Sequence, residues 1–126
     1  MTLSQGMRVE DVMSSPLETV SKDATIKEAA AAMREHNINA LVVTTSPPSI
    51  ITSTDVLAVA ADGGDPAALC VGDVMTTSVE TVTPDLFLEE VAAMMTNFDI
   101  NHLPVVDIDD EYVGMVSSTD ITAQLS

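Results

Sequence analysis

The segment running from residue 102 to residue 120 reads His102-Leu-Pro-Val-Val-Asp-Ile-Asp-Asp-Glu-Tyr-Val-Gly-Met-Val-Ser-Ser-Thr-Asp120. Two β-rich runs stand on either side of an acidic turn, and the polar residues at the end favour a helix start. An earlier segment, Ala40 to Asp55, has the same pattern around a shorter turn, Thr45-Ser-Pro-Pro-Ser49. Both segments therefore predict a strand, a turn, a second strand and a closing helix that starts at Asp55 or Asp120.

This likeness extends to most of the chain. Asp11-Val-Met13 recurs as Asp73-Val-Met75, and Glu18-Thr-Val20 recurs as Glu80-Thr-Val82, in each case 62 residues later. The Ser-Thr-Asp triplets are 65 residues apart, so the second copy has three extra residues before Gly114. Self-similarity at a fixed spacing indicates a duplicated structural unit. We expect one domain over residues 1–126, with repeat 1 at 9–61, a linker at 62–70 and repeat 2 at 71–125.

Each copy also predicts a central helix. The apolar positions follow helical spacing in both copies: Ile26, Ala29, Ala30 and Met33, then Leu88, Val91, Ala92 and Met95. Thr25 and Glu28 form a predicted capping box, whereas Phe87 takes the place of the threonine in repeat 2, so Asp85 is expected to cap there. The order per repeat is β-α-β-β-α. The predicted fold is α/β, with the two repeats packed sheet to sheet in pseudo-two-fold symmetry.

Composition limits the classes of function. Twenty acidic residues against four basic ones give a net charge of −16, which disfavours contact with nucleic acids and with anionic membrane surfaces. No apolar run approaches the roughly 18 residues of a membrane span and no signal-like stretch opens the chain, so a cytoplasmic protein is expected. The acidity and the small-residue core suggest a halophilic source. Cys70, the single cysteine, is expected to be a packed core thiol.

Catalytic and metal-binding signatures are not found. The chain has no phosphate loop, no nucleophile elbow and no clustered His/Cys set, and its two histidines, His36 and His102, belong to no motif. The acidic turn at 107–111 lacks the ligand spacing of a calcium loop and is expected to be a solvated surface turn. We therefore expect no enzyme, no catalytic residues and no metal site.

Repeat 2 resembles the cystathionine β-synthase-type (CBS) repeat. The residues that carry the resemblance are Asp73-Val-Met75, Val82-Thr-Pro-Asp85, His102-Leu-Pro-Val-Val106 and Gly114-Met-Val-Ser-Ser-Thr-Asp120. Repeat 1 matches less fully, because Asn37-Ile-Asn-Ala-Leu-Val-Val43 lacks the proline and Ser49 replaces the glycine. The order of the motifs, found twice, makes the chain similar to a stand-alone tandem CBS pair, or Bateman module.

The resemblance implies clefts between the repeats that bind adenosine-containing ligands. One cleft would use Thr77, Ser78, Ile100, Asn101 and His102 together with Ile50, Thr52 and Asp55. The other would use Ser15, Pro16, Ile38, Asn39 and Ala40 together with Met115, Ser117 and Asp120. Asp55 and Asp120 would accept hydrogen bonds from the ribose hydroxyls, or would simply cap helices. His102 would contact a phosphate or would be a structural histidine.

The implied function is regulatory. A ligand-binding module of this kind would sense AMP, S-adenosylmethionine or methylthioadenosine and act on a separate, unknown protein, and similar pairs form homodimers through the helices that begin at Asp55 and Asp120. ATP is less favoured, because the only bases are Arg8, Lys22, Lys27 and Arg34 and neither Ser/Thr-x-x-Asp segment contains one. The alternative is a protein-interaction or assembly module that binds no nucleotide.

Overall fold

A computed structural model describes residues 6–14, 18–77 and 79–125, apart from the side chain of Leu125. The chain divides into two compact units. We call residues 18–79 the central unit, and residues 1–17 together with 80–126 the terminal unit. The division does not follow the repeats, because the opening segment of each repeat packs in the unit built on the other repeat.

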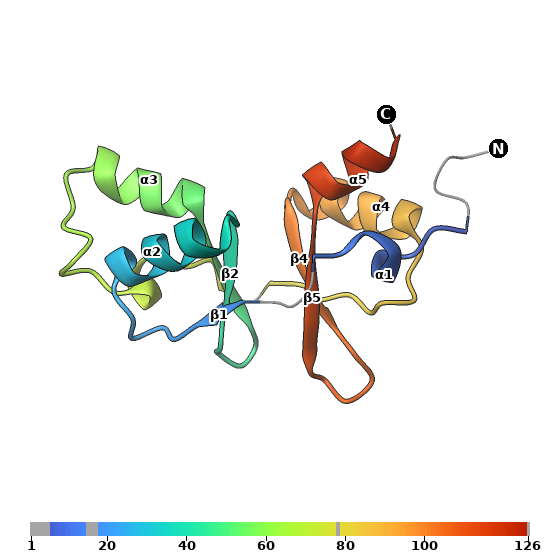
Figure 1. Ribbon diagram of the computed structural model, residues 1–126, viewed down its shortest axis with the longest axis horizontal. Coiled ribbons are helices and arrows are strands. Elements are labelled where there is room, and N and C mark those ends of the chain that lie inside the picture. Colours follow the sequence, from blue (N-terminus) through green and yellow to red (C-terminus); the bar gives the residue numbers. More distant parts are fainter. Residues whose placement is uncertain (1–5, 15–17, 78, 126) are drawn as a thin grey trace. The chain divides into compact units, whose positions relative to one another are not determined.

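The central unit is a small three-stranded sheet with its helices on one face (Figure 1). Its elements in chain order are β1 (Thr19–Val20), α2 (Ile26–His36), β2 (Ala40–Val43), β3 (Ser49–Thr52), α3 (Ser53–Ala61) and the short 3₁₀ helix η1 (Val71–Asp73). β1 runs parallel to β2, and β2 runs antiparallel to β3. A further antiparallel bridge joins Thr76 to Ile50 of β3. The predicted strand, turn and strand are confirmed here.

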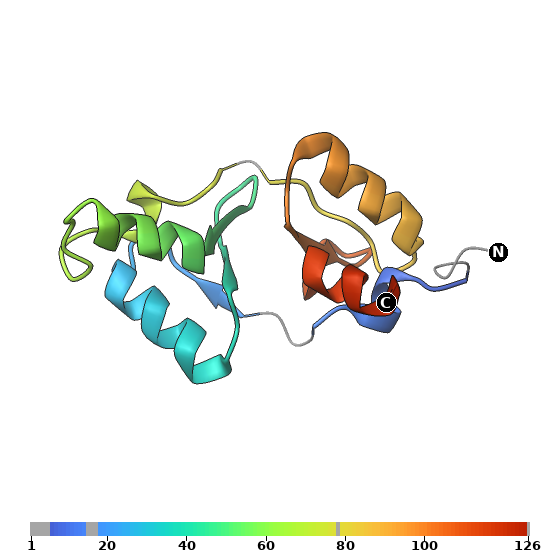
Figure 2. The ribbon, with the colours of Figure 1, turned by 90° about the horizontal axis from the view of Figure 1, so that it is seen from above.

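The terminal unit repeats this plan. It contains α1 (Val9–Val12), α4 (Leu88–Phe98), β4 (His102–Val106), β5 (Tyr112–Ser117) and α5 (Ser118–Leu125), and its helices cover one face of the β4–β5 ladder (Figures 1 and 2). Val82 bridges Val105 in parallel, as Val20 pairs with Val43, and Ser14 bridges Met115, as Thr76 bridges Ile50. The sequence duplication is therefore also a duplication of strand pairing.

Each unit has its own apolar core, built from the predicted helix stripes. In the central unit Ile26, Ala29 and Met33 of α2 pack with Leu41, Val43 and Ile51 of the sheet. In the terminal unit Leu88, Val91 and Met95 of α4 pack with Leu103, Val105 and Val116. Both helices therefore bury the face that the sequence predicts, which is the main stabilisation available to a short amphipathic helix.

Helix starts differ from the prediction in two ways. The closing helices begin at Ser53 and Ser118 rather than at Asp55 and Asp120. The Thr25–Glu28 capping box of α2 is confirmed, but the prediction that Asp85 caps α4 is wrong, because the N-cap residue is Phe87, whose side chain makes no capping bond. The carbonyl of Met7 instead accepts the amide hydrogen of Leu88 at 3.2 Å, so the N-terminal segment satisfies the helix start.

Two further sequence expectations concern single sites. Cys70 is half-buried rather than fully packed, because it stands at the start of η1, where its amide donates to Asp73. The acidic turn at 107–111 is organised by Asp107, whose Oδ1 accepts the amides of Asp109 and Glu111. Among the described residues no group of three or more His, Cys, Asp or Glu side chains could hold a metal ion.

Candidate functional site

The closing helices place Asp55 and Asp120 in matching positions. Oδ2 of Asp55 accepts the amide of Thr52 at 2.9 Å and its hydroxyl at 3.1 Å, while the Thr52 hydroxyl oxygen accepts the Asp55 amide at 3.4 Å. Oδ2 of Asp120 accepts the Ser117 amide at 3.0 Å, and the Ser117 hydroxyl oxygen accepts the Asp120 amide at 3.1 Å. These are reciprocal capping bonds, in which the threonine or serine is the cap and the aspartate is the third helical residue.

Capping leaves part of each carboxylate available. All of the described capping bonds that the carboxylates accept go to Oδ2, both aspartates are half-buried, and no described hydrogen bond involves their Oδ1 atoms. A carboxylate has about four lone-pair sites, so each could accept further donors without losing its capping role. Both aspartates therefore take part in capping, but as the third helical residue and not as the predicted N-cap, and this role is compatible with ligand binding through Oδ1.

A second pair of matching residues holds each helix start to its sheet. The carbonyl of Asn39 accepts the amide of Ser53 at 2.9 Å, and the carbonyl of Asn101 accepts the amide of Ser118 at 2.9 Å. The strand that follows each asparagine pairs with the strand that precedes each closing helix, so Ala40 lies opposite Thr52 and His102 lies opposite Ser117. The backbone thereby brings four of the candidate positions together in each unit.

We call these groups the central half-site and the terminal half-site. The central half-site contains Asn39, Ala40, Thr52 and Asp55, and the terminal half-site contains Asn101, His102, Ser117 and Asp120. The adjoining Ile38 and Ile100 are half-buried, Ile50 and Met115 are buried, and Thr77 is exposed. Ser15, Pro16 and Ser78 lie outside the described residues. The structure thus groups His102 with Ser117 and Asp120, whereas the resemblance divides them between two clefts.

His102 gives the terminal half-site a titratable group that the central one lacks. Burial lowers the pKa of His102 below the ordinary 6.5, and the negative charge of Asp120 opposes this shift. The imidazole is therefore mostly neutral at pH 7, and it gains a proton more readily when a further negative charge approaches. Ala40 stands at the equivalent place in the central half-site and offers no such chemistry.

The glycine that distinguishes the repeats has a steric role. A Cβ on Gly114 would lie 2.7 Å from the carbonyl oxygen of Ser14 and 2.8 Å from Sδ of Met13. Only glycine allows the Met13–Ser14 backbone to approach β5 this closely. At the equivalent position of repeat 1, Ser49 is buried and its hydroxyl lies 2.7 Å from Oγ1 of Thr45.

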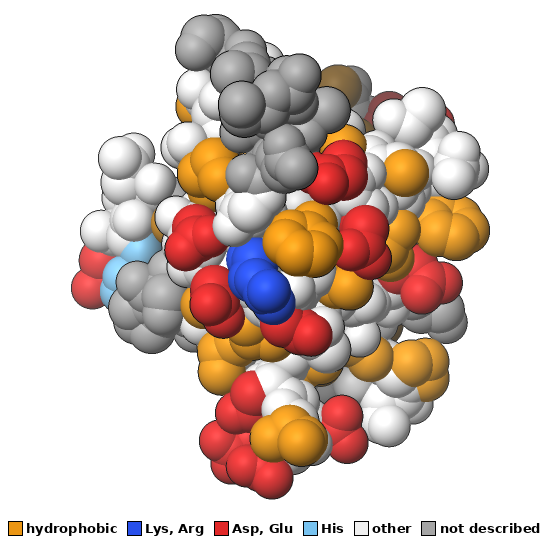
Figure 3. All heavy atoms as spheres, turned by 90° about the vertical axis from the view of Figure 1, so that its right-hand side faces the viewer, with side chains coloured by type: hydrophobic (Ala, Val, Ile, Leu, Met, Phe, Trp, Pro, Cys, Tyr) orange, Lys and Arg blue, Asp and Glu red, His pale blue; other side chains and the backbone are white. Residues whose placement is uncertain are grey.

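Bases are scarce around both half-sites. Arg8, the only base of the terminal unit, donates to the carbonyl of Asp85 at 3.1 Å and lies over the ring of Phe87. Lys22, Lys27 and Arg34 belong to the central unit but are not among its candidate residues. On the face of the molecule that Figure 3 shows, acidic side chains (red) are widespread and basic side chains (blue) cover only a small area.

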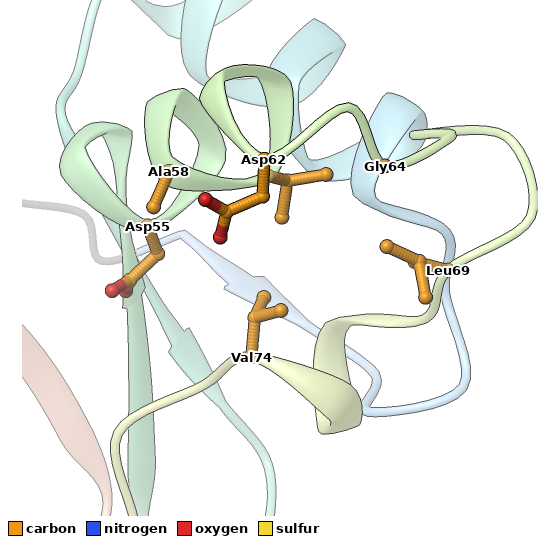
Figure 4. A pocket seen from close by; sticks show the side chains of 7 residues that line it. Asp55, Ala58, Asp62, Gly64, Leu69 and Val74 are labelled. Carbon is orange, nitrogen blue, oxygen red and sulfur yellow. The ribbon is translucent and has the colours of Figure 1, made fainter.

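Sequence reasoning missed one concave feature. A hollow of about 230 Å³ opens beside α3 in the central unit (Figure 4), lined by Asp55, Ala58, Val59, Asp62, Gly64, Leu69 and Val74. Asp55, Ala58 and Asp62 follow helical spacing, which was a possible signal. The segment that closes the other side, residues 64–74, comes from the linker and the start of repeat 2, and no local pattern places it there.

Comparison with known proteins identifies the family. The model of the CBS domain matches residues 9–62 and again residues 71–126. The chain belongs to the CBS-domain family. It is 34% identical over 116 residues to the CBS domain-containing protein YhcV of Bacillus subtilis, covering 90% of this chain and 81% of that one. Several other curated relatives are longer enzymes, and this chain spans only 23–24% of their length.

Solved structures show the same CBS-pair fold. The CBS domain pair of protein MJ0100, in complex with 5′-methylthioadenosine and S-adenosyl-L-methionine, is 32% identical with a TM-score of 0.83, over 95% of this chain and 100% of that chain. A hexameric CBS-CP12 protein from bloom-forming cyanobacteria is 30% identical with a TM-score of 0.86, over 92% of this chain and 69% of that chain. No helix among the described residues is long and apolar enough to cross a membrane.

Proposed function

We propose that this CBS pair is a regulatory module that binds an adenosine-containing ligand and passes the signal to a partner protein. The observation that carries the proposal is the pair of half-sites, each with a carboxylate held by capping bonds and an Oδ1 without a described partner. Vicinal ribose hydroxyls match such an acceptor. The MJ0100 pair, which is similar along nearly the whole chain, binds adenosyl compounds.

Charge narrows the class of ligand. Arg8 is engaged with Phe87 and Asp85, and neither half-site contains Lys or Arg. A triphosphate would bring several negative charges into a chain of net charge −16 with no nearby compensation. AMP, S-adenosylmethionine and methylthioadenosine are therefore preferred to ATP, and S-adenosylmethionine is favoured further because its sulfonium group is positive.

Isothermal titration calorimetry at molar salt tests the proposal, with AMP, ATP with and without Mg²⁺, S-adenosylmethionine and methylthioadenosine as ligands. The Asp55→Asn and Asp120→Asn variants test each half-site by itself. Asp73→Asn is the matched control, because the Asp73 carboxylate accepts the Cys70 amide at 2.9 Å in similar capping geometry outside both half-sites. We expect weaker binding in at least one half-site variant and unchanged binding in the control. If the whole panel fails to bind, the ligand-sensing proposal is wrong.

The alternative function, an interaction module without a nucleotide, is supported by the central half-site. Ala40 and the buried Ser49 stand where the terminal unit has His102 and Gly114. If only Asp120→Asn changes ligand binding, the central half-site has no part in binding the ligand. If no adenosyl compound binds at all, the interaction module becomes the main account.

We further propose a homodimer that buries α3 and α5. On α3, Leu57 is 68% exposed, and Ala61, one turn further along the same helix face, is also exposed. Light scattering after size-exclusion chromatography should show a dimer that Leu57→Ser weakens. Ile108→Ser is the control, because Ile108 is 96% exposed but lies in the β4–β5 turn. A wild-type chain that stays monomeric would refute this assembly.

A further inference from the structure

We propose that the hollow beside α3 binds a primary ammonium group carried on a short aliphatic stem. This inference goes beyond the adenosyl site, with which the hollow shares only Asp55 on its rim. Its chemistry is mixed: two carboxylates stand at the rim, the aliphatic side chains of Val59, Leu69 and Val74 form the interior, and none of the described lining residues is basic. A volume of about 230 Å³ suits a small ligand or one side chain.

The two carboxylates are placed by the geometry of α3. Asp55 and Asp62 are seven residues apart, so they lie on one face of the helix with roughly 10 Å between them along its axis. Figure 4 shows both carboxylates at one side of the hollow, with Val74 and Leu69 reaching in from the opposite segments. No described hydrogen bond involves the carboxylate of Asp62, which is exposed and free to receive a cation.

The wall near Asp62 is formed by the end of the helix. Gly63 has a positive φ of 75°, its amide donates to the carbonyl of Ala60, and the amide of Gly64 donates to the carbonyl of Val59 at 2.9 Å. This is a Schellman ending. A Cβ on Gly64 would lie 3.0 Å from Cδ1 of Leu69 and 3.1 Å from Cγ1 of Val59, so glycine allows these two side chains to close over the helix end.

Charge complementarity defines the occupant. An anion would face two carboxylates in a strongly negative chain, and a bare metal ion would find only one carboxylate at each end of an apolar interior. An alkylammonium ion matches both the apolar interior and the acidic rim, because its aliphatic stem can pack in the interior while its ammonium group binds the carboxylate of Asp62 or Asp55. Two sources share this chemistry, namely a free aliphatic diamine and the lysine side chain of a partner protein.

The test is a titration of ¹⁵N-labelled full chain with 1,5-diaminopentane, followed by the amide signals of Val59, Gly64, Leu69 and Val74. Asp62→Asn removes one charge and is expected to weaken binding about threefold, as for other exposed ion pairs. Ala58→Met fills the hollow from an exposed helix position and should abolish binding. Both variants should leave adenosyl-ligand binding unchanged, which separates this proposal from the function proposed above.

The matched control is Glu35→Gln, which makes the same change of charge on the exposed surface of α2, away from the hollow. If Glu35→Gln weakens diamine binding as much as Asp62→Asn does, or if Ala58→Met still binds the diamine at these amides, binding is a general effect of charge and the proposal is overturned. 1,5-Pentanediol has the stem without the charge and should not bind. Two supporting results distinguish the natural occupant. If N-acetyl-lysine methylamide binds as tightly as the diamine, the occupant is the lysine side chain of a partner protein. If the diamine binds much more tightly, the occupant is a free diamine.

Discussion

Replacing Gly114 by alanine tests how the N-terminal segment is held to the terminal unit. The added Cβ would stand 2.7 Å from the Ser14 carbonyl oxygen and 2.8 Å from Sδ of Met13. The methionine side chain can move, but the carbonyl belongs to a backbone that is bonded to Met115 in both directions, at 2.8 and 3.0 Å. The segment must therefore shift away from β5, and both hydrogen bonds weaken.

The size of the effect follows from these two bonds. A backbone hydrogen bond contributes about 0.5–1.5 kcal/mol net, so losing two costs roughly 1–3 kcal/mol. Alanine returns about 0.4–1 kcal/mol by restricting the unfolded chain. We expect the free energy of unfolding to fall by about 1–2 kcal/mol, measured by urea denaturation at constant molar salt. Hydrogen exchange should show faster exchange at the amides of Ser14 and Met115.

Gly72→Ala is the matched control for this experiment. A Cβ at Gly72 would lie 3.3 Å from its nearest neighbour, the carbonyl oxygen of Lys22, and the next contact is 3.5 Å away. A shift of a few tenths of an ångström accommodates it, so its stability should hardly change. Unaltered stability in Gly114→Ala, together with retained protection of the Ser14 and Met115 amides, would refute the reasoning.

Three further predictions concern capping, pH and salt. Ser117→Ala and Thr52→Ala each remove a capping hydroxyl and should lower the free energy of unfolding by about 1 kcal/mol, measured in urea, whereas an effect confined to one of them would mean that the two caps are not equivalent. The folded state holds the pKa of His102 below 6.5, so the unfolded chain binds the proton more readily. The free energy of unfolding should therefore fall as the pH drops from about 7 through the folded pKa. In denaturation curves at pH 5 to 8, His102→Gln should flatten this pH dependence, and an unchanged slope in the variant would show that His102 is not its source. Raising NaCl from about 0.1 to 1 M shortens the Debye length from about 10 to 3 Å and should raise the melting temperature seen by circular dichroism; equal melting at both concentrations would show that repulsion among the acids is minor.

The strand plan was predictable because it depends on local patterns that occur twice. Alternating and continuous apolar runs mark β2 to β5, helical spacing marks α2 and α4, and Thr25 with Glu28 marks the start of α2. The failure at Asp85 has a physical cause. The start of α4 is satisfied by the Met7 carbonyl, about eighty residues earlier in the chain, and no local rule anticipates a donor–acceptor pair of that separation.

The exchange of opening segments is implied by the resemblance, which groups Thr77 with Ile50, but it does not follow from the residue pattern alone. Ser14 and Thr76 are equivalent in the repeat, as are Ile50 and Met115, so the pattern of residues fits either pairing of opening segment and strand equally well. The hollow beside α3 was missed because its far wall comes from residues 64–74, which read as a loop and a repeat boundary. Its lining becomes visible only when α3 and this segment are seen together.

The duplication separates two properties of the candidate site. The carboxylates of Asp55 and Asp120 are positioned by capping bonds within four residues of chain, so a helix start that keeps a Thr or Ser cap and an Asp at the third helical position retains the acceptor. The side chain that stands opposite each capping residue on the neighbouring strand differs between the copies: it is His102 in the terminal unit and Ala40 in the central unit. Under the proposed function, recognition of a common ribose and discrimination among the groups attached to it would rest on different residues, and the two half-sites could differ in the second property while sharing the first.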